Sequence, residues 1–235
     1  MSLMTKTSAG TKHLVHTFND VVGLGRGVYL WRKYQDYTQL GAVGYPGNIS
    51  LLQNIRNLSG SIVECGVWRG GMMAGIADVL GPDRDYFLFD SFEGMPPAKD
   101  IDGAQAIDWQ SSPDSDNNVA PVQFARQAME RSKAQRVEYV PGWFKDTLPG
   151  FEAPGGIALL RLDADWYEST MQCLDYLYPQ VKPGGLIIID DYYMFDGCSK
   201  AVHEYMARTE SLDRLRSHHR IAYILKGVYD FRGYV

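Results

Sequence analysis

The sequence predicts an α/β fold in which a mostly parallel sheet of seven strands ends in an antiparallel C-terminal hairpin. Short apolar, β-branched runs alternate along the chain with segments that carry apolar side chains at helical spacing. Strands in a parallel sheet are apolar throughout because helices cover both of its faces. Acidic residues directly follow several of these runs, where open parallel sheets bind their ligands.

Seven short apolar segments have the composition of strands, and turn residues bound them. The predicted strands are 61–65, 86–90, 137–140, 156–163, 185–190, 221–225 and 228–234. The first five alternate with helices and are therefore expected to run parallel. Lys226-Gly227 joins the last two and is typical of a tight hairpin, which would add an antiparallel edge.

Helical spacing of apolar side chains predicts the elements between the strands, and glycine or proline marks where several of them end. The predicted helices are 48–58, 72–80, 121–133, 169–178 and 199–208. The segment 91–120 is rich in Pro, Gly and Asp, so we predict a turn-rich loop there. A long loop beside a ligand site often acts as a lid.

The length of 235 residues allows one α/β domain with a small appendage. We assign residues 46–235 to this domain and residues 1–45 to an N-terminal arm. Four aromatic residues are concentrated in the arm: Tyr29, Trp31, Tyr34 and Tyr37. The arm is predicted to form a lid or a dimerisation surface, and we expect a homodimer or a higher homo-oligomer.

The composition favours a soluble protein that acts on small molecules. The chain is 45% hydrophobic and 22% charged, and its net charge of −5 gives no electrostatic case for binding nucleic acid or a membrane surface. The N-terminal segment MSLMTKTSAG contains no apolar core of a secretory signal. The three cysteines have no CxxC spacing. Together these features predict a cytoplasmic protein with free thiols.

A glycine cluster after the first strand is the first candidate for a ligand site. The segment Glu64–Gly71 lets the chain turn tightly and lets a ligand approach the backbone and the next helix. Asp90 ends the second strand, where an acidic side chain accepts hydrogen bonds from ribose. The spacing Gly-x-x-x-Gly-Gly misses the nicotinamide fingerprint. Glu64 instead suits the amino group of adenosylmethionine, although a plain tight turn is the alternative.

Four aspartates form the second candidate site. Asp163 and Asp165 follow the fourth strand, and Asp190 and Asp191 follow the fifth. Because these strands are expected to be neighbours, their carboxylates would converge and raise one another's pKa unless a cation lies between them. Oxygen ligands favour a hard ion such as Mg²⁺. The alternative is that these residues cap helices or turns.

Five ordered blocks, ECGVWRGG, DSFEGMPP, PGWFKDTLP, RLDADWYEST and PGGLIIIDDY, resemble the macrocin O-methyltransferase (TylF-type) family. The resemblance extends from about Tyr45 to Val202. It implies the Rossmann-like fold of class I methyltransferases, S-adenosylmethionine as methyl donor, and Mg²⁺. It also implies a glycosylated small-molecule acceptor, methylated on a sugar hydroxyl of an antibiotic or a similar natural product.

The resemblance also assigns roles to individual residues. By similarity, Asp163, Asp190 and Asp191 match metal ligands, and Asp165 matches a general base. The residues that match methyl-donor binding are Glu64, Gly66, Trp68, Gly70, Asp90 and Ser91, with Gly142 and Trp143 near the adenine. Trp68 departs from the general class I pattern, in which glycine often holds this position.

Three other functions stay open at this stage. A catechol-like acceptor could replace the sugar, because both offer adjacent oxygens to a metal. The chain could also be a non-catalytic nucleotide-binding module. A nicotinamide oxidoreductase is disfavoured by the glycine spacing. His218-His219 could be taken for a catalytic base, but their place among arginines favours a solvated basic turn.

Overall fold

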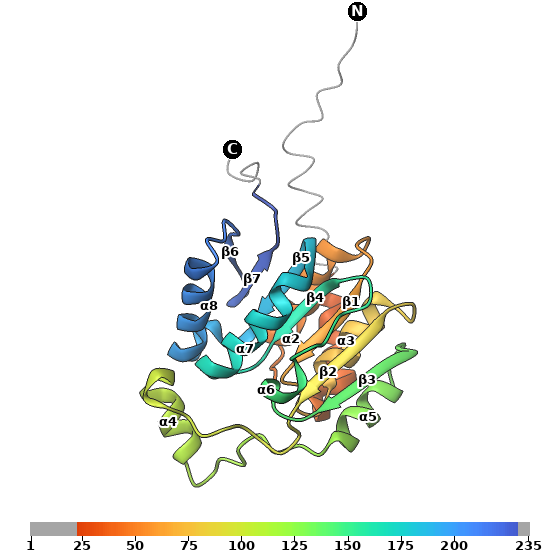
Figure 1. Cartoon of the computed structure of the whole chain (residues 1–235). Coiled ribbons are helices and arrows are strands. Elements are labelled where there is room, and N and C mark those ends of the chain that lie inside the picture. The colour runs from red at the N-terminus through yellow and green to blue at the C-terminus, as the bar shows by residue number, and fades with distance from the viewer. Residues whose placement is uncertain (1–22, 230–235) are drawn as a thin grey trace, which may run out of the picture.

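The computed structural model describes residues 23–229, which form a seven-stranded sheet with helices on both faces (Figure 1). The strand order is β3-β2-β1-β4-β5-β7-β6. β1 to β5 are parallel, and β7 is antiparallel to both β5 and β6. This arrangement confirms the predicted fold, a mostly parallel sheet with an antiparallel C-terminal hairpin.

The bounds of the elements follow the chain in an alternating order. The strands are β1 Ser61–Cys65, β2 Asp85–Asp90, β3 Arg136–Pro141, β4 Ile157–Leu162, β5 Val181–Ile189, β6 Leu215–His218 and β7 Ile221–Leu225. The α-helices with defined bounds are α2 Gly44–Leu51, α3 Gly71–Leu80, α4 Ala104–Ser111, α5 Val122–Glu130, α6 Phe144–Thr147, α7 Tyr167–Leu177 and α8 Asp196–Arg208. The 3₁₀ helices are η1 Gln35–Tyr37, η2 Leu52–Ile55, η3 Asp100–Asp102, η4 Tyr178–Gln180 and η5 Asp190–Tyr193.

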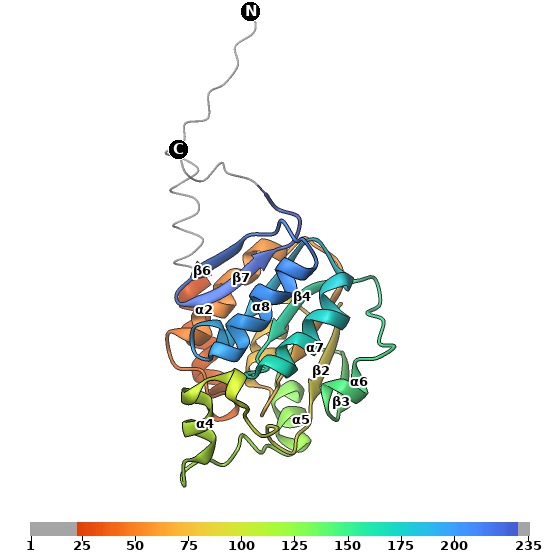
Figure 2. The ribbon, with the colours of Figure 1, turned by 60° about the vertical axis from the view of Figure 1, so that its left-hand side comes forward.

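Alternation along the strands divides the core into two layers. Ile62 and Leu159 pack with α2, α3, α5 and the helical residues 23–34, whereas Val63 and Leu160 pack with α7 and α8. Figure 2 shows α7 and α8 together on one side of the sheet. Side chains of successive residues point to opposite faces of a strand, so the apolar runs supply both layers at once.

The C-terminal hairpin exists, and its predicted strand 221–225 is confirmed as β7, but the predicted partner strand 228–234 is wrong in the residues that the structure describes. β7 pairs with β6, which precedes it, and not with a strand at 228–234; Val228 and Tyr229 are not in a strand, and residues 230–234 lie outside the described range. The turn is His219-Arg220, whose φ angles are 48° and 65°. Two positive φ values suit the twist of a hairpin. This turn lacks the glycine or asparagine by which such a turn is usually predicted from sequence.

The segment 91–120 is also more ordered than predicted, because it contains η3 and α4. Ala106 of α4 is fully buried, and the Trp109 ring packs edge-on against Trp166 with centroids 6.3 Å apart. Both views place α4 at the end of the molecule away from β6 (Figures 1 and 2). The i, i+3 spacing of these two residues was the overlooked helical signal.

The described part of the N-terminal arm packs on the sheet domain. Residues 23–34 are helical, and Tyr34 is fully buried with its hydroxyl donating to Asp78 Oδ2 at 2.9 Å. Lys33 forms an ion pair with the same carboxylate at 2.7 Å. Residues 1–22 lie outside the described range, so the division at residue 45 stays a prediction. Within residues 23–229, no helix has the length and apolar character needed to span a membrane.

Candidate active site

A cavity of about 880 Å³ lies beyond the carboxyl ends of β1, β2, β4 and β5. Eleven of the twelve residues predicted for the site line it: Glu64, Gly66, Trp68, Asp90, Ser91, Gly142, Trp143, Asp163, Asp165, Asp190 and Asp191. The exception, Gly70, caps α3 with φ 80° and faces Ala125. The topology therefore brings the two candidate sites into one cavity.

The glycine loop after β1 closes against β4. The Gly66 amide donates to Phe89 O at 2.9 Å, and a Cβ on Gly66 would lie 1.7 Å from Asp163 O. Its φ of 83° also favours glycine, so both the close approach to Asp163 and the backbone conformation require glycine here. Trp68 has φ 48°, a left-handed conformation that glycine adopts more readily than tryptophan.

Asp90 holds the glycine loop in place. Its Oδ2 accepts the amides of Val67 and Trp68 at 2.6 and 2.8 Å, and its Oδ1 accepts the Phe92 amide at 2.7 Å. Burial raises the pKa of Asp90, while these backbone N–H groups oppose the rise. The Ser91 hydroxyl donates to Gly94 O and shapes the following turn. The sequence had suggested a ligand contact for Asp90, and the structure adds this local role.

Glu64 lines the cavity and has one carboxylate oxygen without a hydrogen-bond partner within residues 23–229. Its side chain is 1% exposed, and Oε1 pairs with Arg161 Nη1 at 2.9 Å. Oε2 is buried and has no hydrogen-bond partner among the described residues. Burial raises the pKa of Glu64 to about 8 despite the attraction of Arg161. A buried acceptor without a partner is costly, and a donor group on a bound ligand would satisfy it.

Three aspartates gather at the ends of β4 and β5. One carboxylate oxygen each from Asp163, Asp165 and Asp191 lies within 4.8 Å of the other two. Burial raises the pKa of Asp163 to about 6, and burial with the neighbouring carboxylates raises those of Asp165 and Asp191 well above their ordinary value. An all-oxygen set of this size fits a hard divalent cation, which would relieve the repulsion.

Asp190 is placed differently from the other three aspartates. Its Oδ1 lies 2.9 Å from Arg161 Nη2 and 3.4 Å from Asn48 Nδ2. It lines the cavity but is not in the group of oxygens within 4.8 Å. The geometry thus favours Asp163, Asp165 and Asp191 as the converging set. The assignment of Asp190 as a ligand and of Asp165 as the base stays a prediction.

The backbone of Asp165 is in a left-handed conformation with φ 54°. Its amide donates to Asp191 Oδ2 at 3.0 Å, which ties the loop after β4 to the end of β5. Such conformations cost energy in residues other than glycine and cluster at functional sites. Local sequence carries no signal for this strain.

Arg161 was not among the residues predicted for the site. Its side chain is 1% exposed and contacts Glu64, Asp163 and Asp190. A basic residue inside the apolar run of β4 was the available signal. Asn48 on α2 was not predicted either; its Oδ1 accepts a hydrogen bond from Arg161 Nε at 3.3 Å.

The rest of the cavity wall is largely apolar. Trp109, Trp166 and Phe195 line it, and the Trp166 and Phe195 rings meet edge-on at 5.0 Å. The N-terminal residues 37–40 line it as well, and Gln39 Nε2 donates to Asn118 Oδ1 at 2.9 Å. Neither His218 nor His219 lines the cavity: His218 ends β6 with its Nε2 2.8 Å from Ser50 Oγ, and only His219 lies in the predicted turn.

The sequence matches known proteins over most of its length. The family model for macrocin O-methyltransferase (TylF) matches residues 51–218. The chain is 44% identical over 160 residues to 8-demethyl-8-(2,3-dimethoxy-alpha-L-rhamnosyl)-tetracenomycin-C 4'-O-methyltransferase of Streptomyces olivaceus, covering 63% of this chain and 59% of that protein. It is 40% identical over 189 residues to demethyldecarbamoylnovobiocin O-methyltransferase of Streptomyces niveus, covering 71% and 69%.

The chain thus spans about three fifths of the first of these relatives and just over two thirds of the second. Among solved structures, the O-methyltransferase NovP matches with a TM-score of 0.67 and 33% identity, covering 82% of this chain and 83% of that one. The calicheamicin methyltransferase CalS11 matches with a TM-score of 0.59 at 20% identity, which shows the shared fold. The chain therefore belongs to the macrocin O-methyltransferase (TylF) family and has the fold of a class I methyltransferase.

Proposed function

We propose that this protein transfers a methyl group from S-adenosylmethionine to a sugar hydroxyl of a glycosylated natural product, assisted by Mg²⁺. The observation that carries the proposal is the convergence of Asp163, Asp165 and Asp191 in the cavity that also holds the glycine loop. The names of the relatives, which methylate a rhamnosyl tetracenomycin and a novobiocin precursor, support this acceptor class.

The methyl donor fits the end of the cavity at β1 and β2. Glu64 Oε2 is the buried acceptor for its amino group, and Asp90 is expected to accept a ribose hydroxyl at the same edge. Trp143 and Gly142 line the cavity next to Ser91, where the adenine is expected. Adenosylmethionine would supply the electrophilic methyl group, while these residues orient it.

The acceptor side of the reaction requires an activated hydroxyl. A cation held by the aspartates would supply Lewis acidity and a template for two adjacent oxygens. Asp165 is proposed to accept the proton from the attacking hydroxyl, because it lies beside Asp163 and Asp191 in the cavity and burial raises its pKa well above the ordinary value. The apolar wall formed by Trp109 and Phe195 excludes water and fits an apolar aglycone.

Asp165→Asn tests the proposed base. If Asp165 is the base and not a ligand, the variant should slow turnover by about 10²–10⁴-fold and keep the affinities for S-adenosylhomocysteine and Mg²⁺ measured by calorimetry. Asp190→Asn should weaken Mg²⁺ binding if Asp190 is a ligand. Asp175→Asn, on the exposed surface of α7, is the matched control and should change neither. Normal turnover of Asp165→Asn would refute the role of base.

The same variants separate the two possible ligand sets. If Asp165→Asn loses Mg²⁺ affinity while Asp190→Asn keeps it, Asp165 is a ligand, and the converging set of this structure holds the cation. A wild-type protein that methylates simple catechols faster than glycosylated acceptors would contradict the proposed acceptor class. We also propose a homo-oligomer, which sedimentation velocity can test.

A further inference from the structure

One buried guanidinium connects the two halves of the cavity. Arg161 is on β4, its side chain is 1% exposed, and its charged group contacts residues from four separate parts of the chain. These partners are Glu64 on β1, Asn48 on α2, Asp163 after β4 and Asp190 at the start of η5. Glu64 lies on the methyl-donor side, and both aspartates lie on the side proposed for the cation.

The register of three parallel strands, and the alternation of side chains along each strand, bring this cluster together. Glu64 is the direct partner of Arg161 in the β1–β4 register, and Ile188 is its partner in the β4–β5 register. Asp163 and Asp190 each follow by two residues, so their side chains leave the strands on the same face as Arg161. α2 covers that face and supplies Asn48.

The contacts divide the guanidinium nitrogens among the acidic groups. Nη1 lies 2.9 Å from Glu64 Oε1 and 2.8 Å from Asp163 Oδ2, and both contacts are hydrogen bonds. Nη2 lies 2.9 Å from Asp190 Oδ1 but is not aligned as a hydrogen bond. Nε donates to Asn48 Oδ1 at 3.3 Å. Arg161 therefore pairs with one oxygen of each aspartate, and a carboxylate has a second oxygen for another partner.

The charge balance distinguishes this cluster from a simple core ion pair. Three carboxylates surround one guanidinium, and Asp165 and Asp191 stand beside them. A buried pair that served stability alone could be replaced by apolar residues at little cost. The excess of negative charge is instead suited to a second cation. Arginine is required here because its planar fork can hold several carboxylates in fixed directions, whereas a lysine ammonium is a point charge.

We propose that Arg161 is a positioning residue, which holds Asp163 in the orientation that receives the divalent cation, keeps Asp190 beside that site, and ties both to Glu64. The inference rests on the proposed function, because it assumes that a cation binds at the aspartates. Residues that orient metal ligands contribute to affinity without touching the metal.

The test is Arg161→Lys, which keeps the positive charge and removes the fork. We expect Mn²⁺ affinity measured by electron paramagnetic resonance, and Mg²⁺ affinity measured by calorimetry, to fall about 10–100-fold. The retained charge ensures that such a loss reflects geometry and not electrostatics. Affinity for S-adenosylhomocysteine should change less, because Arg161 donates to Glu64 Oε1 and not to Oε2.

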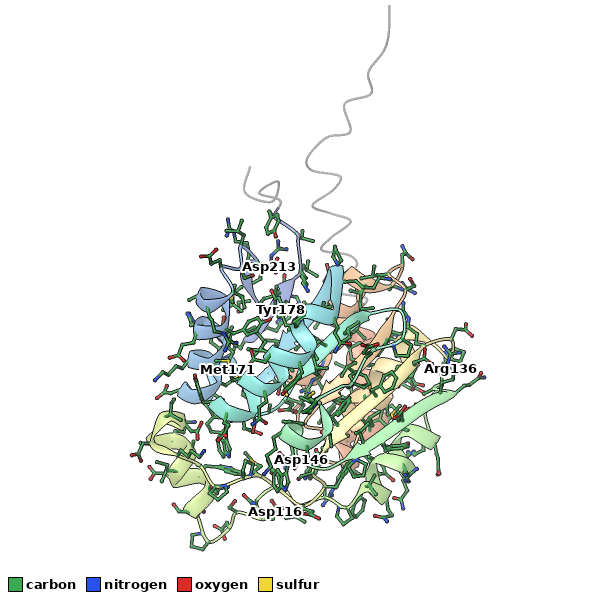
Figure 3. The ribbon with its side chains drawn as sticks, viewed as in Figure 1. Asp116, Arg136, Asp146, Met171, Tyr178 and Asp213 are labelled. Atoms are coloured by element: carbon green, nitrogen blue, oxygen red, sulfur yellow. The ribbon has the colours of Figure 1, made fainter. Side chains whose placement is uncertain are left out.

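Tyr178→Phe is the matched control for a loss of stability. It removes a buried hydroxyl that donates to Asp213, and Figure 3 shows both residues at the end of the molecule opposite Asp116 and Asp146. This variant should unfold at a lower temperature and bind Mg²⁺ like the wild type. Asn48→Ala removes one contact of Arg161 and should weaken cation binding in the same direction as Arg161→Lys, but by less.

The outcomes separate the two levels of the proposal. A wild-type protein that binds neither Mg²⁺ nor Mn²⁺ refutes the metal-assisted function, and the inference with it. A wild type that binds the cation, with Arg161→Lys binding it equally well, refutes the positioning role alone. If Arg161→Lys does not fold, unchanged cation affinity in Asn48→Ala overturns the inference, and weakened affinity supports it.

Discussion

Asp90→Asn is the substitution whose effect the structure defines most closely. The carboxylate accepts three backbone N–H groups, two through Oδ2 and one through Oδ1. An asparagine at this position has a single acceptor oxygen and an NH₂ group in place of the other. If the asparagine oxygen keeps the hydrogen bonds from the amides of Val67 and Trp68, the asparagine NH₂ group faces the amide of Phe92. Both of these groups are donors, so no hydrogen bond forms between them.

The magnitude follows from one lost hydrogen bond in a partly buried position. Leaving a backbone donor without its acceptor costs about 1–3 kcal/mol. For a chain of this size, each kcal/mol lowers the melting temperature by roughly 2–4 °C, so the variant should melt roughly 2–12 °C lower. The loop between Gly66 and Trp68 should also lose its shape, and affinity for S-adenosylhomocysteine should fall with it.

Calorimetry measures both effects, as a scan for unfolding and as a titration for binding. The matched control is Asp85→Asn at the other end of β2, where the carboxylate pairs with Arg136 on the exposed surface. That change should leave ligand affinity as it is in the wild type. A melting temperature and ligand affinity of Asp90→Asn equal to those of the wild type would refute the reasoning.

Three further predictions concern the arm, the glycine loop and the acidic cluster. Tyr34→Phe removes the hydroxyl that donates to Asp78 and should cost about 1–3 kcal/mol in denaturant unfolding; an unchanged midpoint would contradict this. Gly66→Ala places a Cβ 1.7 Å from Asp163 O and should abolish binding of S-adenosylhomocysteine in titrations, so retained binding would show that the loop adapts. Burial raises the pKa of Asp163 from 3.8 to about 6. Between pH 3.8 and about 6 the folded chain therefore binds more protons than the unfolded chain, so the free energy of unfolding without added cation falls as pH rises through this range. Mg²⁺ competes with these protons, and it should raise the melting temperature more at about pH 7.5 than at about pH 5.5; equal shifts would argue against binding at Asp163.

The local sequence was sufficient for the succession of the five parallel strands with most of the helices between them, and for the residues at the strand ends. Apolar runs such as 157–162 are typical of strands that helices cover on both faces, and the glycines at 66 and 70 adopt conformations that other residues avoid. The rule that ligands bind beyond the carboxyl ends of parallel strands then placed Asp90 and the four aspartates near one cavity. These are properties of short segments and of a general topology.

Only the tertiary structure decided which of these residues face one another. Arg161 is opposite Glu64 because β1 and β4 pair in one particular register, and a local pattern does not specify the register between distant strands. Contacts from elsewhere in the fold hold Asp165 in its left-handed conformation and shape the turn at His219. Neither residue type by itself predicts the conformation observed there. The separation of Asp190 from the converging aspartates has the same origin, because it depends on a guanidinium 29 positions earlier that packing brings to its side.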